Sequence, residues 1–180
     1  MVIARQLILV NGLPASGKTT LARALAIELG IPVVSKDAVK EPLADITGTT
    51  VGSTALGALA SETMWRLAGL VPGRAIVESW WFAPRDLDFV RKGLPTAGNP
   101  AIVEVWCDVP PELAWKRYLA RERHAIHPAG QSSFGPWAEW MDDPQPLGLG
   151  PVVRVATDRS VDVAALAAML DSHFAGSSAG

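Results

Sequence analysis

Residues 12 to 19 combine the side-chain types and the spacing that bind phosphate. They read Gly-Leu-Pro-Ala-Ser-Gly-Lys-Thr, which fills every fixed position of the G-x-x-x-x-G-K-[ST] phosphate-binding loop. Gly12 and Gly17 let the backbone curl so that its N–H groups face phosphate oxygens. Lys18 can reach the outer phosphates, and the Thr19 hydroxyl is placed to bind Mg²⁺. The pattern predicts that the chain binds a nucleoside triphosphate; the alternative is a glycine-rich turn that only caps a helix.

The segments around this loop are the ones the motif requires. An apolar run at residues 7–10 leads into it, and a helical pattern at 18–29 leads out. We expect nucleotide contacts from eight positions: Gly12, Pro14, Ala15, Ser16, Gly17, Lys18, Thr19 and Thr20. Further along, short apolar runs alternate with helical patterns, which predicts an α/β fold with a parallel sheet flanked by helices. The expected strands are 5–11, 32–35, 74–79, 101–107 and 151–156, and the expected helices are 18–29, 36–46, 53–70, 86–92, 110–123 and 161–174.

A carboxylate follows the second expected strand. Lys36 and Asp37 come directly after residues 33–35. Ligands bind at the carboxyl ends of the strands in open parallel sheets, so Asp37 is aimed at the same crevice as the phosphate loop. There it could take the proton of a hydroxyl that attacks the γ-phosphoryl group. Asp also caps helices readily, and the spacing alone leaves both interpretations open.

The phosphate loop followed by Val-Ser-Lys-Asp-Ala-Val-Lys-Glu resembles the small P-loop kinases, which include polynucleotide kinase, chloramphenicol phosphotransferase and the zeta-type toxin kinases. The resemblance implies a three-layer fold with a five-stranded parallel sheet and a small lid, ATP and Mg²⁺ as cofactors, and Asp37 as general base. Lys40 falls where polynucleotide 5′-kinases carry an arginine for substrate phosphate. Arg159, after the last strand, falls where related kinases contact the adenine base.

The third expected strand also ends in an acid. Glu78 could hold Mg²⁺ through water or bind the acceptor, as the resemblance suggests; the alternative is an exposed acid at a strand end. Trp80 and Trp81 follow it, near the carboxyl edge of the sheet, where their rings could line an acceptor pocket. Ordinary packing in the core is the alternative for each of these rings.

The most basic stretch is residues 116–124. Arg117 and Arg121 are four residues apart, which predicts that they share one helical face. A helix that ends in arginines and enters a Pro- and Gly-rich stretch resembles the lid of these kinases, where arginines clamp the triphosphate. This implies a nucleotide contact for Arg117 and catalytic roles for Arg121 and Arg123, unless the cluster is a solvated face. His124 and His127, without Cys or further carboxylates nearby in the sequence, do not make a metal site.

The composition sets limits on the class of protein. With 180 residues and 49% hydrophobic residues, the chain fits one domain at 1–175, with a lid at about 121–145 and a flexible tail at 176–180. The net charge of −2 argues against a nucleic-acid backbone as the main partner. No apolar run is long enough to cross a membrane, and the single Cys107 suits a reducing cytoplasm as a buried thiol.

Together these features predict an ATP- and Mg²⁺-dependent phosphotransferase that acts on a hydroxyl of a small molecule. Asp37 would be the base, Lys18 and a lid arginine would stabilise phosphoryl charge, and Thr19 would hold the metal. The alternatives are a nucleotide or polynucleotide 5′-hydroxyl kinase and a nucleotide-dependent regulatory NTPase. The sequence does not indicate the acceptor or the oligomeric state.

Overall fold

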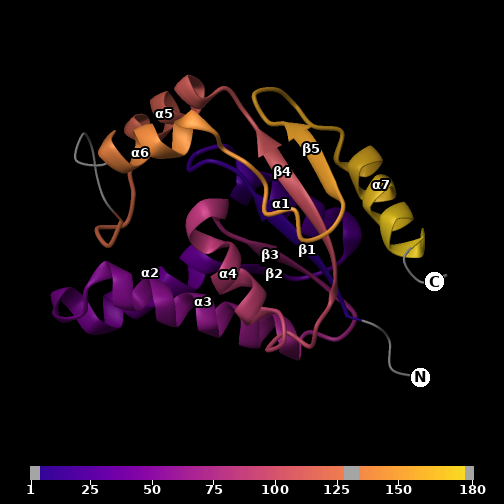
Figure 1. Cartoon of the computed structure of the whole chain (residues 1–180), viewed down its shortest axis with the longest axis horizontal. Coiled ribbons are helices and arrows are strands. Elements are labelled where there is room, and N and C mark those ends of the chain that lie inside the picture. Colours follow the sequence, from indigo (N-terminus) through magenta and orange to yellow (C-terminus); the bar gives the residue numbers. More distant parts are fainter. Residues whose placement is uncertain (1–4, 128–133, 177–180) are drawn as a thin grey trace.

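A five-stranded parallel sheet forms the centre of the computed structural model, which describes residues 5–127 and 134–176 (Figure 1). The strand order is β2-β3-β1-β4-β5, and every neighbouring pair is parallel. The strands are β1 (Gln6–Asn11), β2 (Val33–Ser35), β3 (Arg74–Glu78), β4 (Ala101–Asp108) and β5 (Val152–Ala156). The predicted sheet is therefore confirmed.

The helices follow the strands in alternation, as the sequence pattern predicts. They are α1 (Lys18–Leu29), α2 (Lys36–Thr47), the 3₁₀ turn η1 (Gly48–Thr50), α3 (Ser53–Leu70), α4 (Ala83–Gly93), α5 (Pro111–Ala120), α6 (Phe134–Asp142) and α7 (Val163–Gly176). None of the described helices is both long and apolar enough to cross a membrane. Gly176, expected in the tail, is the last residue of α7, and residues 177–180 lie outside the described ranges.

The fifth helix is shorter than expected. It ends at Ala120, and Arg121 has an extended backbone with φ −93° and ψ 128°. The prediction that Arg117 and Arg121 share a helical face is therefore wrong. Residues 121–127 contact α2 instead, through ion pairs and hydrogen bonds that the helical pattern of the sequence does not contain.

Both faces of the sheet are covered, which gives the molecule three layers. Ile8 and Val10 of β1 face one way and pack with α1 and α7, whereas Leu7 and Leu9 face the other way and pack with α3 and α4. This alternation follows from the two-residue period of a strand. A sheet buried on both faces needs the continuous apolar strands seen in the sequence.

A third apolar cluster lies beyond the carboxyl ends of the central strands. Leu13 and Val109 pack there with α5 and α6, which lie together past the tip of β4 (Figure 1). The buried Trp137 ring lies 4.9 Å from the Trp115 ring and 5.2 Å from the Tyr118 ring, measured between centroids. Such aromatic pairs contribute about 0.5–1.5 kcal/mol each beyond area burial, so they fix α6 against α5.

A buried polar network joins the start of the phosphate loop to distant parts of the sheet. The Asn11 side chain accepts hydrogen bonds from the N–H groups of Gly12 (2.7 Å) and Trp81 (3.0 Å) and donates to Glu104 Oε1 (3.0 Å). The fully buried Glu104 carboxylate also accepts from the N–H groups of Leu147 and Gly148, both at 2.9 Å. A buried carboxylate requires such donors, since an unpaired one is costly.

Candidate active site

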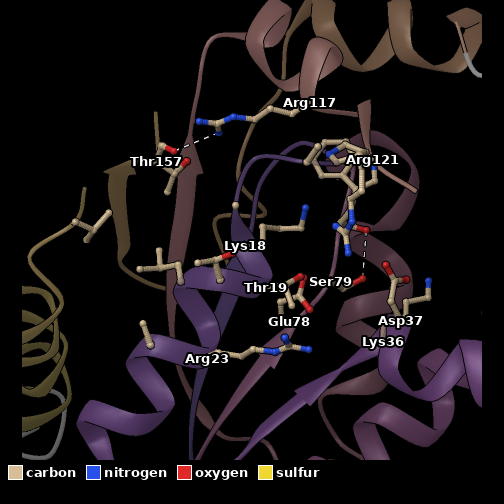
Figure 2. A pocket seen from close by; sticks show the side chains of 18 of the residues that line it. Lys18, Thr19, Arg23, Lys36, Asp37, Glu78, Ser79, Arg117, Arg121 and Thr157 are labelled. Carbon is tan, nitrogen blue, oxygen red and sulfur yellow. Dashed lines mark hydrogen bonds between the residues drawn. The ribbon is translucent and has the colours of Figure 1, made fainter. Parts of the chain in front are cut away.

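A cavity with a volume of about 900 Å³ opens at the carboxyl edge of the sheet. The phosphate loop, α2, the end of β3, residues 117–127, α6 and the segment after β5 all contribute to its wall. Its charged lining residues are Lys18, Arg23, Lys36, Asp37, Lys40, Glu78, Arg85, Arg117, Arg121 and Arg159. Figure 2 shows Lys18, Thr19, Glu78 and Asp37 around this opening. Segments that are far apart in the sequence therefore meet in one site, as the rule for parallel sheets predicts.

The phosphate loop has a backbone that few sequences can adopt. Gly12 has φ +141°, and a Cβ there would lie 2.7 Å from the Cys107 carbonyl oxygen and 2.9 Å from Ser16 Oγ. Gly17 has φ +94° and stands at the N-terminus of α1. Ala15 has φ +61°, a left-handed conformation that costs a non-glycine residue roughly 1–3 kcal/mol and clusters at functional sites. The glycine positions of the motif are thus required by the observed geometry.

The loop residues divide into those that line the cavity and those that shape the loop. Among the expected nucleotide contacts, Gly12 and Ser16 do not line the cavity; the Gly12 N–H is bonded to Asn11 and the Ser16 N–H donates to the Leu13 carbonyl oxygen at 3.0 Å. The expectation of a phosphate contact from the Gly12 amide is therefore not met. The loop residues that line the cavity are Pro14, Ala15, Gly17, Lys18, Thr19 and Thr20.

A buried cation that lines the cavity indicates that this loop fits phosphates. The Lys18 ammonium is buried and donates to the Leu13 carbonyl oxygen at 2.8 Å. Burial lowers the pKa of Lys18, and the nearby Glu78 charge opposes this shift. Ser16 Oγ is buried without a hydrogen-bond partner among the described residues. Bound phosphate oxygens would supply the counter-charge that a buried ammonium needs.

Oxygen atoms suited to a magnesium ion lie next to the loop. The Thr19 hydroxyl donates to Glu78 Oε1 at 3.3 Å, and the Ser35 hydroxyl donates to Glu78 Oε2 at 2.6 Å. Glu78 is 5% exposed, so the alternative of an exposed acid at the strand end is wrong. Carboxylate and hydroxyl oxygens are the ligands Mg²⁺ prefers, and it is usually held by one or two carboxylates with water and phosphate. Thr19 and Glu78 are therefore the residues that would hold it.

Asp37 lies in the first turn of α2 but does not cap the helix. Ser35 occupies the N-cap position, and no side chain caps this helix. The Asp37 carboxylate lines the cavity, is 56% exposed, and lies 4.0 Å from the Arg123 guanidinium. An acid in the first turn still interacts favourably with the helix dipole. The capping interpretation thus loses its basis, whereas the carboxylate is accessible from the cavity.

The segment after α5 is docked on an acidic face of α2. Arg123 approaches Asp37, and the ring Nε2 atoms of His124 and His127 lie 2.9 Å from Asp45 and 3.0 Å from Glu41. The three acids are spaced by four residues, so they share one face of the helix. Burial lowers the pKa of His127, with smaller opposing effects from nearby carboxylates. Carboxylates distant in sequence thus do approach His127, contrary to the sequence-based argument, and we interpret the contact with Glu41 as a hydrogen bond.

Three arginines of this region have different positions. Arg117 Nη1 donates to the Thr157 carbonyl oxygen at 3.3 Å and lines the cavity beside the segment that carries Arg159 (Figure 2). Arg121 also lines the cavity, on the opposite side of the opening from Glu78 (Figure 2). Arg123 does not line it; its guanidinium lies 4.9 Å from the centre of the Tyr118 ring as well as near Asp37.

The two tryptophans expected in the pocket separate. Trp80 lines the cavity together with Trp140, and their ring centroids are 5.8 Å apart. Trp81 is 4% exposed and stacks on Trp65 in the core at 6.1 Å, so its predicted contact with the acceptor is wrong. The reason is the alternation of extended backbone, which turns neighbouring side chains to opposite sides.

The comparisons with known proteins agree with this geometry. Residues 7–143 match the AAA_33 family, described as an AAA domain. The chain belongs to this family. No curated protein matches this AAA domain protein.

Solved structures similar to this AAA domain protein cover almost its whole length. A candidate kinase from Chloroflexus aurantiacus is 27% identical, with a TM-score of 0.77 over 94% of this chain and 98% of that chain. A gluconokinase from Sinorhizobium meliloti is 19% identical, with a TM-score of 0.64 over 96% and 97%. Kti12 from Chaetomium thermophilum in complex with ADP-AlF3 is 19% identical, with a TM-score of 0.66 over 93% and 98%. The expected P-loop kinase-like fold is therefore confirmed.

Several cavity residues of this AAA domain protein escaped the sequence analysis. Lys36 and Arg85 had no assigned site role, although Lys36 directly follows β2 and Arg85 lies at the start of the helix that follows β3. Both lysine and arginine therefore stand at the carboxyl edge of the sheet, and this position was the available signal. The expected lid at 121–145 lies partly outside the described residues, at 128–133.

Proposed function

We propose that the protein is an ATP- and Mg²⁺-dependent kinase that transfers the γ-phosphoryl group to a hydroxyl of a small molecule. The observation that carries this proposal is the position of Asp37. Its carboxylate is accessible in the same cavity as the phosphate loop and is not used to cap α2. A hydrolase that only binds nucleotide does not need an accessible carboxylate opposite the triphosphate site, whereas a kinase with a hydroxyl acceptor can use it as a base.

The residues of the site then have distinct roles. Lys18 and the amides of the loop bind the outer phosphates, and Arg121 stabilises charge that develops on the transferring group. The oxygen of the acceptor hydroxyl forms a bond to the γ-phosphorus while the bond between that phosphorus and the leaving ADP oxygen breaks. Asp37 accepts the proton that the hydroxyl loses. A magnesium ion at Thr19 and Glu78 would neutralise phosphate charge. Residues 121–127 with α6 would act as the lid that excludes water.

The decisive experiment replaces Asp37 by asparagine. Asp37→Asn keeps the size of the side chain but removes its charge and basicity, and general-base catalysis contributes roughly 10²–10⁴ in rate. We expect kcat to fall by that factor while the melting temperature and the ATP affinity stay near wild type. Transfer of ³²P from [γ-³²P]ATP to a pool of small metabolites extracted from cells measures the effect.

Asp45→Asn is the matched control for this experiment. Asp45 is also an acid of α2 and contacts His124 from the same region of the chain, but it does not line the cavity. It should therefore retain wild-type turnover. Wild-type kcat in Asp37→Asn would remove the proposed base, and slow ATP hydrolysis that is indifferent to any acceptor would favour a regulatory NTPase.

A further inference from the structure

The lysines on either side of Asp37 face the same cavity. Lys36 and Lys40 are four residues apart on α2, which places them on one face of the helix, and both line the cavity. In Figure 2, Lys36 and Asp37 lie on the opposite side of the phosphate loop from Thr157. The pair therefore stands on the acceptor side of the site, away from the segment after β5.

Neither of these two ammonium groups forms a close ion pair with a described residue, although the charges of Asp37, Asp86 and Glu41 act on them from farther away. Lys40 is 8% exposed, and the hydrogen bond of its Nζ is to Ser53 Oγ at 2.8 Å. Within the described ranges, no carboxylate lies within 4.0 Å of either ammonium group. An ammonium group has three donors, so Lys40 has two left. Burial lowers the pKa of both lysines, and for Lys40 the charge of Lys36 adds to this effect.

The acids nearby already contact other side chains. Asp86 forms an ion pair with Arg85 at 2.6 Å, Asp37 approaches Arg123, and Glu41 bonds to His127. Lys36 and Lys40 therefore take no part in the ion pairs and hydrogen bonds that these acids form.

The cavity as a whole has an excess of positively charged side chains. Among the described residues, eight lysine and arginine side chains line it, against two carboxylates, although the chain has a net charge of −2. A nucleoside triphosphate with its magnesium ion would lie against the phosphate loop and the arginines beyond it. Such a ligand leaves the lysines of α2 without a bound anion, and an unpaired charge is costly at a buried position such as that of Lys40.

We propose that the acceptor carries an anionic group, a carboxylate or a phosphate, which the ammonium groups of Lys36 and Lys40 bind while its hydroxyl faces Asp37. This inference rests on the proposed kinase function. It narrows the acceptor to small hydroxy acids and phosphorylated alcohols, because a neutral alcohol would give neither ammonium group a counter-ion. Ammonium groups act on both anions as point charges, so the two lysines recognise the charge that these anions share.

The first experiment separates acceptors by charge. Small metabolites extracted from cells are passed over an anion-exchange resin, and transfer from [γ-³²P]ATP is measured with the neutral and the retained fractions. We expect the labelled product from the retained fraction alone. That fraction is also treated with a phosphatase, and the phosphatase is removed before the assay. This treatment destroys an acceptor that carries a phosphate and leaves an acceptor that carries a carboxylate intact. Product from the neutral fraction alone would overturn this inference and leave the kinase function intact; product from neither would overturn both.

The second experiment tests the lysines themselves. Lys36→Met and Lys40→Met should each raise the KM for the retained fraction at least tenfold, with the KM for ATP within about twofold of wild type. Lys92→Met, which removes an exposed lysine at the end of α4, is the matched control and should leave both values unchanged. Lys40→Met should melt no lower than wild type in the absence of acceptor, since it removes a buried charge that has no ion pair in the described part of the chain. An unchanged KM for the retained fraction in both variants would overturn the inference.

Discussion

Replacement of Gly12 by alanine tests whether the phosphate loop is as tightly built as the structure indicates. At φ +141° a side chain is strained by roughly 1–3 kcal/mol. The new Cβ would also lie 2.7 Å from the Cys107 carbonyl oxygen, a backbone atom that cannot rotate away, and overpacking of this kind costs roughly 1–3 kcal/mol. The free energy of unfolding should therefore fall by roughly 2–6 kcal/mol, or roughly 4–24 °C in melting temperature for a chain of this size.

Gly30→Ala provides the comparison for this variant. Gly30 also has a positive φ, +63°, but nothing lies within 4 Å of the Cβ it would gain. It should lose roughly 1–2 kcal/mol from the backbone conformation alone, and any entropy gain from the Gly-to-Ala change is common to both variants. Thermal unfolding of the two purified variants, with ATP binding by calorimetry, measures the difference. Equal melting temperatures and intact ATP binding in Gly12→Ala would refute the close contact with β4.

Two further predictions concern residues 121–127. Arg121→Ala should lower kcat by about 10²-fold with little change in ATP affinity, because Arg121 would stabilise charge that develops during transfer. Arg123→Ala should also lower kcat, because Arg123 lies next to Asp37. If kcat is unchanged in both variants, the segment is only a solvated surface. Burial lowers the pKa of His127 below its ordinary value of 6.5, so the folded state favours the neutral ring. The stability that the neutral ring contributes is therefore complete above pH 6.5 and is lost as the pH falls below that value. His127→Gln should therefore flatten the acid loss of stability between about pH 8 and about pH 5 more than His124→Gln does, in urea unfolding; identical pH profiles would contradict this.

Local patterns predicted the elements of the fold well. The first and third helices were expected at 18–29 and 53–70 and have these bounds, since apolar spacing and flanking glycines define them locally. Where tertiary contacts decide, prediction failed. The fifth helix ends early because residues 121–127 bind acids on α2, and no pattern in the sequence relates two segments about eighty residues apart.

For the site, the residues that adjoin strand ends were the predictable ones. The phosphate loop and Asp37 were found because their sequence neighbours position them. Glu78 was left between two interpretations, because its burial depends on hydrogen bonds from Thr19 and Ser35, which come from other elements. The two-residue alternation of an extended chain could have assigned Trp81 to the core. Val77 lies four residues earlier, so it shares a face with Trp81, and it packs against α3.

The hydrogen bonds of Glu104 constrain how the cover of the site can move. The segment that contains α5 and α6 begins directly after β4. Near its end, the amides of Leu147 and Gly148 donate hydrogen bonds to Glu104 of that same strand. Both ends of this segment are thus anchored to one strand, only a few residues apart along it. We therefore expect any opening to pivot near β4, with α5 and α6 moving together because aromatic contacts join them. Because Asn11 ties Glu104 to the Gly12 amide, this pivot is linked to the first residue of the phosphate loop.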